Sequence, residues 1–298
     1  MTLHPQSVAA LGLWAEGPSV ADPGFGPADI EATRAEGLAA AALEAKEPVD
    51  RVEDVDADGV PCRLYVPDGA QRTVVFLHGG GFVFGDVDTH DGQSRRLANR
   101  TRSAVLAVDY RRPPEHRFPA APDDVDTALA WLLVNAGGRG LDLARVAACG
   151  DSAGGNLALV AALRNPNALA ATVLVYPFVD AAMTMPSYGA PDGGLTRGEA
   201  AWFWDQYART VGDRHDPDLV PYLSDGLATL PPTLVQVAEH DVLADEDHEL
   251  VRRMRAAGAT VEETTYPGMV HGFWRNPQLF DAAEEALAEI AGFLDRHV

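Results

Sequence analysis

The feature that most constrains the fold of this chain is a series of short, continuously apolar runs separated by longer amphipathic stretches. Two of these runs are Val74-Val75-Phe76-Leu77 and Val105-Leu106-Ala107-Val108. A strand that is apolar on both faces is typical of a parallel sheet covered by helices on both sides. From about residue 50 onward, the sequence therefore predicts an α/β fold with a mostly parallel central sheet flanked by helices.

The alternating pattern can be divided into individual strands and helices. Strands are expected at Arg63–Val66, Thr73–His78, Ala104–Asp109, Arg145–Cys149, Thr172–Tyr176, Thr233–Ala238 and Val261–Tyr266. Helices are expected at Asp91–Arg100, Pro122–Asn135, Ala153–Arg164, Asp245–Ala257 and Gln278–Arg296.

Two segments do not fit this alternation. Residues 1–45 are rich in alanine and helical in pattern, and residues 181–228 interrupt the sequence between two predicted strands. Breaks in the first segment are expected at Pro18, Pro23 and Pro27. An insertion as long as the second is usually functional or a subdomain of its own. We interpret the two segments as a two-part helical cap, and residues 46–180 and 229–298 as the two parts of the core.

A serine lies at the junction of one predicted strand and the helix that follows it. This serine is the centre of Gly150-Asp151-Ser152-Ala153-Gly154, which follows the apolar run that ends at Cys149. A serine on such a sharp turn presents its hydroxyl beyond the sheet, and the flanking glycines allow close packing of the neighbouring elements. The context predicts a catalytic nucleophile, whereas the same five residues elsewhere are an ordinary glycine-rich turn.

A serine hydroxyl needs a general base and a group that orients the base. Among the nine histidines, His271 lies just after the last predicted strand, in a loop bracketed by glycines. Asp241 closely follows the strand that ends at Ala238, so it belongs at the same edge of the sheet as the serine. These positions predict His271 as the base and Asp241 as its orienting partner, with Glu239 and Asp245 as rivals for the second role.

Acyl transfer also needs hydrogen-bond donors for a developing oxyanion. The segment His78-Gly79-Gly80-Gly81-Phe82 follows a predicted strand, and consecutive glycines let backbone N–H groups turn inward. A phosphate cradle is the alternative for such a loop. The sequence has neither the G-x-x-x-x-G-K-[ST] pattern nor a G-x-G-x-x-G that opens a helix, so the oxyanion interpretation is favoured.

Together these motifs resemble those of the hormone-sensitive-lipase-like esterases, which are bacterial-type carboxylesterases with the α/β-hydrolase fold. The resemblance is carried by His78-Gly79-Gly80-Gly81, Asp109-Tyr110-Arg111, Pro114-Glu115-His116, Phe118-Pro119-Ala120, Gly150-Asp151-Ser152-Ala153-Gly154-Gly155-Asn156 and His271-Gly272-Phe273. It extends from about residue 50 to the C-terminus. The order serine, aspartate, histidine along the chain agrees with it.

The resemblance implies a serine carboxylesterase with a two-part cap that requires no metal or cofactor. The residues it assigns are Ser152, Asp241 and His271 for the catalytic triad and Gly80, Gly81 and Ala153 for the oxyanion hole. His78 is expected to brace the glycine loop and not to transfer protons. Three alternatives remain: an aryl-formamidase or amidase on the same triad, a true lipase, and a non-catalytic binding protein like the plant hormone receptors, which have lost the histidine.

Bulky residues in the second cap segment suggest the size of the substrate. We expect short-to-medium acyl chains because Trp202, Trp204 and Tyr207 are large enough to block a long slot. The same aromatic residues would also suit the core of the cap itself. Further residues expected to shape the pocket are Phe82, Phe84 and Met269.

The formal net charge of −21 argues against nucleic acid and anionic membrane surfaces as partners, because both would repel the protein. A small-molecule ester is the expected partner, and the oligomeric state is open, a homodimer included. Cys62 and Cys149 do not form a disulfide framework in a chain of this length. The sequence shows neither a secretory signal nor an apolar run long enough to span a membrane, so a cytoplasmic location is expected.

Overall fold

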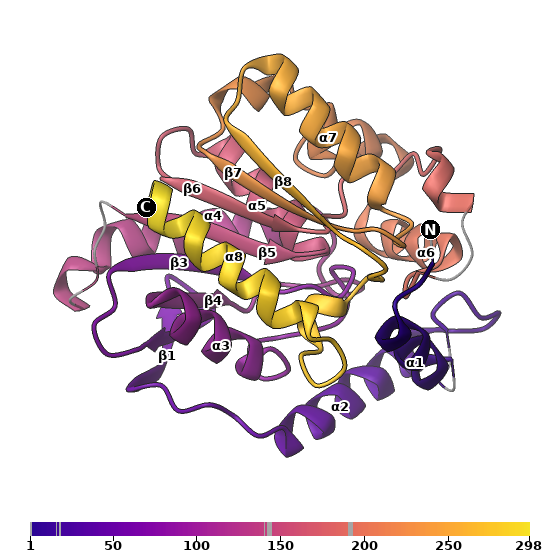
Figure 1. Ribbon diagram of the computed structural model, residues 1–298, viewed down its shortest axis with the longest axis horizontal. Coiled ribbons are helices and arrows are strands. Elements are labelled where there is room, and N and C mark those ends of the chain that lie inside the picture. The colour runs from indigo at the N-terminus through magenta and orange to yellow at the C-terminus, as the bar shows by residue number, and fades with distance from the viewer. Residues whose placement is uncertain (1, 16, 18, 140, 142–144, 190–192) are drawn as a thin grey trace.

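The computed structural model of the chain describes residues 2–15, 17, 19–139, 141, 145–189 and 193–298. Pro18, where a break was expected, lies outside the described residues. A single sheet forms the centre of the molecule, and helices pack on both of its faces (Figure 1). None of the helices in these described ranges is long and apolar enough to cross a membrane.

The sheet has eight strands in the order β1-β2-β4-β3-β5-β6-β7-β8. The strands are β1 (Arg51–Ala57), β2 (Val60–Val66), β3 (Arg72–Leu77), β4 (Ser103–Val108), β5 (Val146–Asp151), β6 (Ala171–Val175), β7 (Thr233–Ala238) and β8 (Val261–Tyr266). β2 is antiparallel to both of its neighbours, and all other neighbouring strands are parallel. The predicted α/β fold with a mostly parallel sheet is therefore confirmed.

The helices divide between the two faces of this sheet. The α-helices are α1 (Pro5–Trp14), α2 (Pro27–Leu43), α3 (Asp91–Thr101), α4 (Ala120–Asn135), α5 (Ala153–Arg164), α6 (Arg197–Tyr207), α7 (Ala244–Ala257) and α8 (Ala282–His297). Short 3-10 helices are Gly137–Arg139, Pro186–Gly189, Val211–His215, Pro221–Leu223, Asp225–Thr229 and Phe273–Arg275. α3 and α8 bury their apolar residues on one face, and α4, α5 and α7 on the other. In Figure 1, α8 crosses the near face of the sheet.

The predicted helices and strands of the core are all present, and β7 and β8 have the predicted bounds. The sequence prediction missed β1 (Arg51–Ala57) and the first residues of β2. β1 alternates polar and apolar residues because it is an edge strand, so it lacks the continuous apolar run of the central strands. A signal was available in the turn Asp58-Gly59, whose φ angles of 54° and 92° close the β1–β2 hairpin.

The two segments expected to form a cap are in contact with each other. The Ser19 hydroxyl donates a hydrogen bond of 2.8 Å to Glu199 Oε1 on α6. The Phe25 ring meets Trp202 edge to face, with 5.5 Å between the ring centroids. α1 and α6 lie on the same side of the molecule, at the right of Figure 1. The division of the chain into cap and core segments stays a prediction.

Candidate active site

Ser152 lies on the turn between β5 and α5. Its φ angle of 56° is in the left-handed region, which residues with a side chain rarely adopt. At Gly154 a Cβ atom would lie 1.9 Å from the carbonyl oxygen of Leu77 on β3. Only glycine fits there, and the close approach of β3 holds the serine at the carboxyl end of the sheet.

Two hydrogen bonds connect Ser152, His271 and Asp241. Ser152 Oγ is 2.9 Å from His271 Nε2, and Asp241 Oδ2 is 2.6 Å from His271 Nδ1. Because a carboxylate oxygen only accepts, Nδ1 carries the ring proton, and Nε2 accepts from the serine hydroxyl. The fold thus brings together the three residues that the sequence predicted, in an arrangement suited to nucleophilic attack.

Glu239 and Asp245, the alternatives to Asp241, form hydrogen bonds with other parts of the chain. Glu239 Oε2 accepts a hydrogen bond of 2.7 Å from the N–H of Gly268. Asp245 Oδ2 accepts one of 2.8 Å from the N–H of Ser187. Only Asp241 among the three carboxylates contacts the imidazole, which favours it for the orienting role.

Charge and burial act in opposite directions on His271. Burial lowers the pKa of the imidazole, but the charge of Asp241 and its hydrogen bond together raise it by more than burial lowers it. The pKa of His271 therefore lies above the usual 6.5. Burial also raises the pKa of Asp151, next to the serine, to about 6, against the opposing charge of Arg275. The raised pKa means that the surroundings of His271 stabilise its imidazolium form, as the predicted role of general base requires.

The glycine loop after β3 faces the serine across a shared cavity. The φ angles of Gly80 and Gly81 are 110° and 59°, a conformation that glycine adopts without steric cost. Within the described ranges of the chain, no protein group accepts a hydrogen bond from the N–H of Gly80, Gly81 or Ala153. These three donors are available to an oxyanion at the position that Ser152 would attack.

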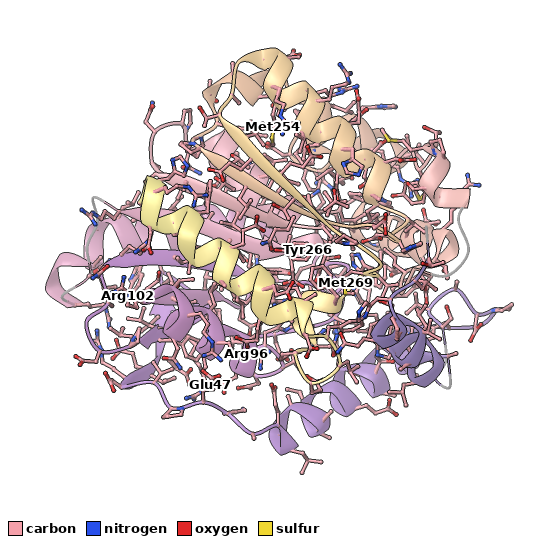
Figure 2. All side chains as sticks on the ribbon, in the orientation of Figure 1. Glu47, Arg96, Arg102, Met254, Tyr266 and Met269 are labelled. Atoms are coloured by element: carbon pink, nitrogen blue, oxygen red, sulfur yellow. The ribbon has the colours of Figure 1, made fainter. Side chains whose placement is uncertain are left out.

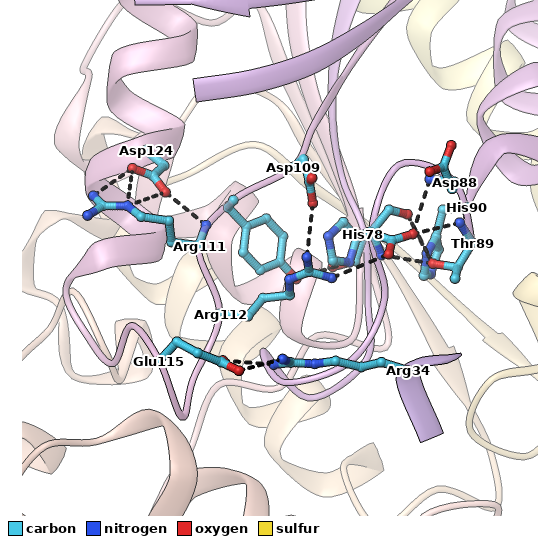
Figure 3. A network of polar contacts seen from close by, with 12 residues as sticks. Arg34, His78, Asp88, Thr89, His90, Asp109, Arg111, Arg112, Glu115 and Asp124 are labelled. Atoms are coloured by element: carbon cyan, nitrogen blue, oxygen red, sulfur yellow. Dashed lines mark hydrogen bonds and ion pairs between the residues drawn. The ribbon is translucent and has the colours of Figure 1, made fainter. Parts of the chain in front are cut away.

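A buried histidine supports this loop from the core side. His78 Nδ1 donates a hydrogen bond of 2.8 Å to the carbonyl of Gly79, and the Tyr110 hydroxyl donates one of 2.7 Å to the carbonyl of His78. Figure 3 shows His78 beside His90, whose ring centroid is 4.9 Å away. Burial lowers the pKa of His78 to about 3, so the ring stays neutral. These contacts agree with the expected bracing role.

Arg34 connects the cap helix α2 to the glycine loop. Its Nε donates to the carbonyl of Val83 at 3.0 Å, and its Nη2 donates to the carbonyl of Pro113 at 2.7 Å. Its Nη1 pairs with Glu115 at 2.9 Å, as Figure 3 shows. α2 and the loop that carries the oxyanion donors are therefore held in one arrangement.

The active-site cavity beside Ser152 has a volume of about 280 Å³. Its apolar lining comprises Val20, Phe84, Phe178, Leu195 and Phe203, and its charged lining comprises Asp151, Glu199 and Arg275. In the part of the chain that the structure describes, no group of three or more His, Cys, Asp or Glu residues is arranged to hold a metal ion.

The expectation that Trp202, Trp204 and Tyr207 block the cavity is wrong, because none of them lines it. Trp204 and Tyr207 are fully buried in the core, where Trp204 packs on Phe178 with 4.3 Å between ring centroids. The two residues are three apart on α6 and so share the face turned toward the core. Phe203, which directly precedes Trp204, is the α6 aromatic that lines the cavity.

The other pocket predictions are met in part. Phe84 lines the cavity, whereas Phe82 and Met269 are buried outside it. Cavity residues that the sequence did not single out include Tyr176, Glu199 and Arg275. Only Arg275 carried a local signal, since it lies four residues after the histidine in the same loop.

Comparisons with known proteins agree with this geometry. A family model described as the α/β hydrolase fold matches residues 74–275. The ethyl acetate hydrolase of Pseudomonas putida is 36% identical over 282 residues, which cover 88% of each chain. The carboxylic ester hydrolase LipN of Mycobacterium tuberculosis is 37% identical over 256 residues, 81% of this chain and 68% of LipN. A solved structure of a hyperthermophilic esterase from the archaeon Pyrobaculum calidifontis has a TM-score of 0.90 at 35% identity, covering 99% of this chain and 98% of that one.

The fold and the serine-centred site define an α/β hydrolase. With these matches, the chain belongs to the hormone-sensitive-lipase-like carboxylesterase family, and the predicted enzyme class, carboxylic ester hydrolase, is confirmed.

Proposed function

We propose that the chain hydrolyses short-to-medium acyl esters through an acyl-enzyme formed on Ser152. The observation that carries the proposal is the unbroken contact from Ser152 Oγ through His271 to Asp241, at the wall of a cavity that also contains Gly80 and Gly81. The proposed nucleophile, its base and two of the three proposed oxyanion donors thus line one cavity.

In the proposed reaction, Ser152 Oγ attacks the ester carbonyl carbon while its proton passes to His271 Nε2. The carbonyl oxygen becomes an oxyanion that the N–H groups of Gly80, Gly81 and Ala153 stabilise. The imidazolium then gives its proton to the leaving alcohol, and the acyl group stays on the serine. A water molecule, deprotonated by the same nitrogen, attacks this ester and releases the carboxylic acid.

The expected preference for small acyl groups is supported by the cavity. Its volume of about 280 Å³ lies near the lower end of typical small-molecule sites. The Phe203 ring lies directly over Gly81, since a Cβ at that glycine would be 2.1 Å from Phe203 Cδ1. The name of the Pseudomonas putida relative, ethyl acetate hydrolase, agrees with a small substrate.

The test is hydrolysis of p-nitrophenyl esters from acetate to laurate by the intact protein and by Ser152→Ala. We expect turnover to fall by several orders of magnitude in the variant, and the acetate and butyrate esters to react faster than the laurate ester. An aryl formamide assayed in parallel addresses the amidase alternative. Hydrolysis of the formamide without hydrolysis of any ester would overturn the proposal.

A comparison of single and double variants tests whether Ser152 and His271 act together in catalysis. With Ser152→Ala and His271→Ala assayed singly and together, the double variant is expected to be hardly slower than either single one, because the two residues act as a unit. Additive losses would mean that the two side chains act independently. A cytoplasmic location and a homodimer stay predictions that these assays do not address.

A further inference from the structure

Arg275 lies in the wall between the active-site cavity and a second cavity. The second cavity, here called the α2–α3 cavity, has a volume of about 240 Å³ and lies between α2, α3 and the segment after His271. Its polar lining residues include Thr89, Gln93, Arg96, Arg275 and Asn276. Figure 2 shows Arg96 on the side of the molecule where α3 faces the chain that follows α2. Because Arg275 lines both cavities, a ligand that contacts Arg275 in one cavity can extend into the other.

Arg275 differs from almost all other arginines of this acidic chain. The net charge is −21, and most of the other arginines in the described ranges are paired with carboxylates, as Arg111 is with Asp124 at 2.7 Å. Over the same ranges, the exposed side chain of Arg275 has no hydrogen bond or ion pair, and Arg197 at the start of α6 is the only other arginine whose side chain has none. A guanidinium has five N–H donors, so Arg275 is free to bind an anion in the cavity.

The carboxylates near Arg275 have other partners. Glu199 Oε1 accepts from the Ser19 hydroxyl at 2.8 Å, and Glu199 Oε2 accepts from the backbone N–H of Thr196 at 2.8 Å. Asp151 Oδ1 accepts from the N–H of Gly79 at 3.1 Å. None of these carboxylates forms an ion pair with Arg275, which leaves the donors of its guanidinium for a ligand.

The α2–α3 cavity also contains buried donors without a partner. Gln93 is only 3% exposed, and neither its amide nitrogen nor its amide oxygen has a hydrogen bond to any residue that the structure describes. Arg96 pairs through Nη1 with Glu44 at 2.9 Å, but its buried Nε is unpaired. Buried polar groups are normally hydrogen-bonded, so an unpaired amide in a cavity wall points to a polar ligand. With two arginines and one glutamate, the lining favours an anion.

We propose that Arg275 binds a carboxylate carried by the ester itself, and that the α2–α3 cavity is the subsite for this end of the substrate. The substrate class is then esters with a distal carboxylate, such as monoesters of dicarboxylic acids. This inference rests on the proposed function, because the same molecule must present its ester to Ser152. A carboxylate suits the planar guanidinium fork, and its single charge is tolerated better than a phosphate dianion near Asp151 and Glu199.

The kinetic test uses substrate pairs that differ in charge and not in size. Monoethyl succinate, glutarate and adipate are compared with the corresponding primary amides, which replace the carboxylate by a neutral group of the same shape. The acetate ester of 3-hydroxypropanoate and its amide place the charge on the alcohol side. The readout is the ratio of kcat/KM for the acid to kcat/KM for the amide, so a general loss of activity cancels.

We expect this ratio to exceed one for at least one pair and to fall by about tenfold to a hundredfold in Arg275→Gln. Arg275→Lys should recover part of the ratio, because it keeps the charge and loses the fork. Arg197→Gln is the matched control, since Arg197 is equally unpaired and lies outside both cavities. If Arg275 served only to stabilise the charge of Asp151, Arg275→Gln would affect acid and amide equally.

The binding test needs no turnover. Glutarate should raise the melting temperature of the intact protein, and glutaramide should not, because a ligand of the native state stabilises it in proportion to its affinity. The shift should disappear in Arg275→Gln. Gln93→Leu should also reduce the shift while leaving the unliganded protein at least as stable, since the replaced amide has no partner in the protein.

The two proposals fail in different ways. Absence of Ser152-dependent hydrolysis of any ester would overturn the proposed function, and the glutarate shift would still decide whether the carboxylate subsite exists. Hydrolysis of neutral esters with an acid-to-amide ratio that Arg275→Gln leaves unchanged, and no shift with glutarate, would overturn the subsite.

Discussion

Replacing Phe203 by alanine is expected to lengthen the acyl chain that the enzyme accepts. The Phe203 ring lies against Gly81 and meets Phe84 edge to face, with 6.0 Å between ring centroids. Both neighbours belong to the glycine loop after β3, so the ring forms a wall of the cavity beside the proposed position of the acyl carbonyl. The substitution removes the six ring carbons and opens this end of the cavity.

The size of the effect follows from the burial of methylene groups. Each additional acyl methylene that enters the opened space contributes about 0.8 kcal/mol, or roughly fourfold in kcat/KM. Four methylenes separate a butyrate from an octanoate ester, so the octanoate-to-butyrate ratio should rise by at most about 200-fold. A smaller rise is expected where the loop relaxes into the space that the ring occupied.

The assay is kcat/KM for p-nitrophenyl butyrate and octanoate, with the melting temperature measured to verify folding. Trp202→Ala is the matched control, because Trp202 precedes Phe203 on α6, stacks on Phe84 and does not line the cavity. The control should leave the ratio within about twofold of the wild-type value, since it opens no space for acyl methylenes. A folded Phe203→Ala variant with the wild-type ratio would refute the idea that this ring limits the acyl chain.

Three further predictions concern the triad, the cap and the serine turn. The activity should be lost as pH falls through the raised pKa of His271, above 6.5, because only the neutral imidazole accepts the serine proton. Asp241→Asn should move this acid limb to lower pH and reduce kcat by roughly 10⁴-fold, and a pH–rate profile with an unshifted limb would contradict the assignment. Arg34→Met should speed hydrogen exchange in α2, because it removes the contacts to the glycine loop, and unchanged protection would show that other contacts hold the helix. Gly154→Ala should lower the free energy of unfolding by about 3 kcal/mol in urea, because its Cβ would overlap the backbone of β3, whereas Gly12→Ala, with no atom within 4 Å, should not.

The sequence predicted the core well because its signals are local. Continuous apolar runs mark strands that are buried on both faces, and β7, which is buried along its whole length, was found with its bounds. β1 was missed because an edge strand buries only one face and so carries a weaker pattern. The serine turn was predictable because its glycines lie within two residues of the serine and form a recognisable local pattern, although the contact that requires Gly154 is with Leu77 on β3.

For the aromatic residues of α6, the sequence did not indicate which side chain lines the cavity and which are buried in the core. Trp204, Tyr207 and Phe203 are close in sequence and similar in size, but only Phe203 lines the cavity. Which face of a helix meets the core depends on how the helix packs, and a one-residue step turns a side chain by about 100°. Composition and spacing could therefore predict an aromatic cap segment and could not say which ring limits the substrate.

By itself, the sequence determined the α/β architecture, the serine turn and the candidate members of the catalytic site, because each is marked by residues that are neighbours in the chain. The tertiary structure alone shows which of Asp241, Glu239 and Asp245 contacts the imidazole, since only Asp241 meets His271, 30 residues away. It also placed Arg275 in the lining of both the active-site cavity and the α2–α3 cavity. Contacts of this kind join distant segments, and their geometry is set by packing, which no short stretch of sequence encodes.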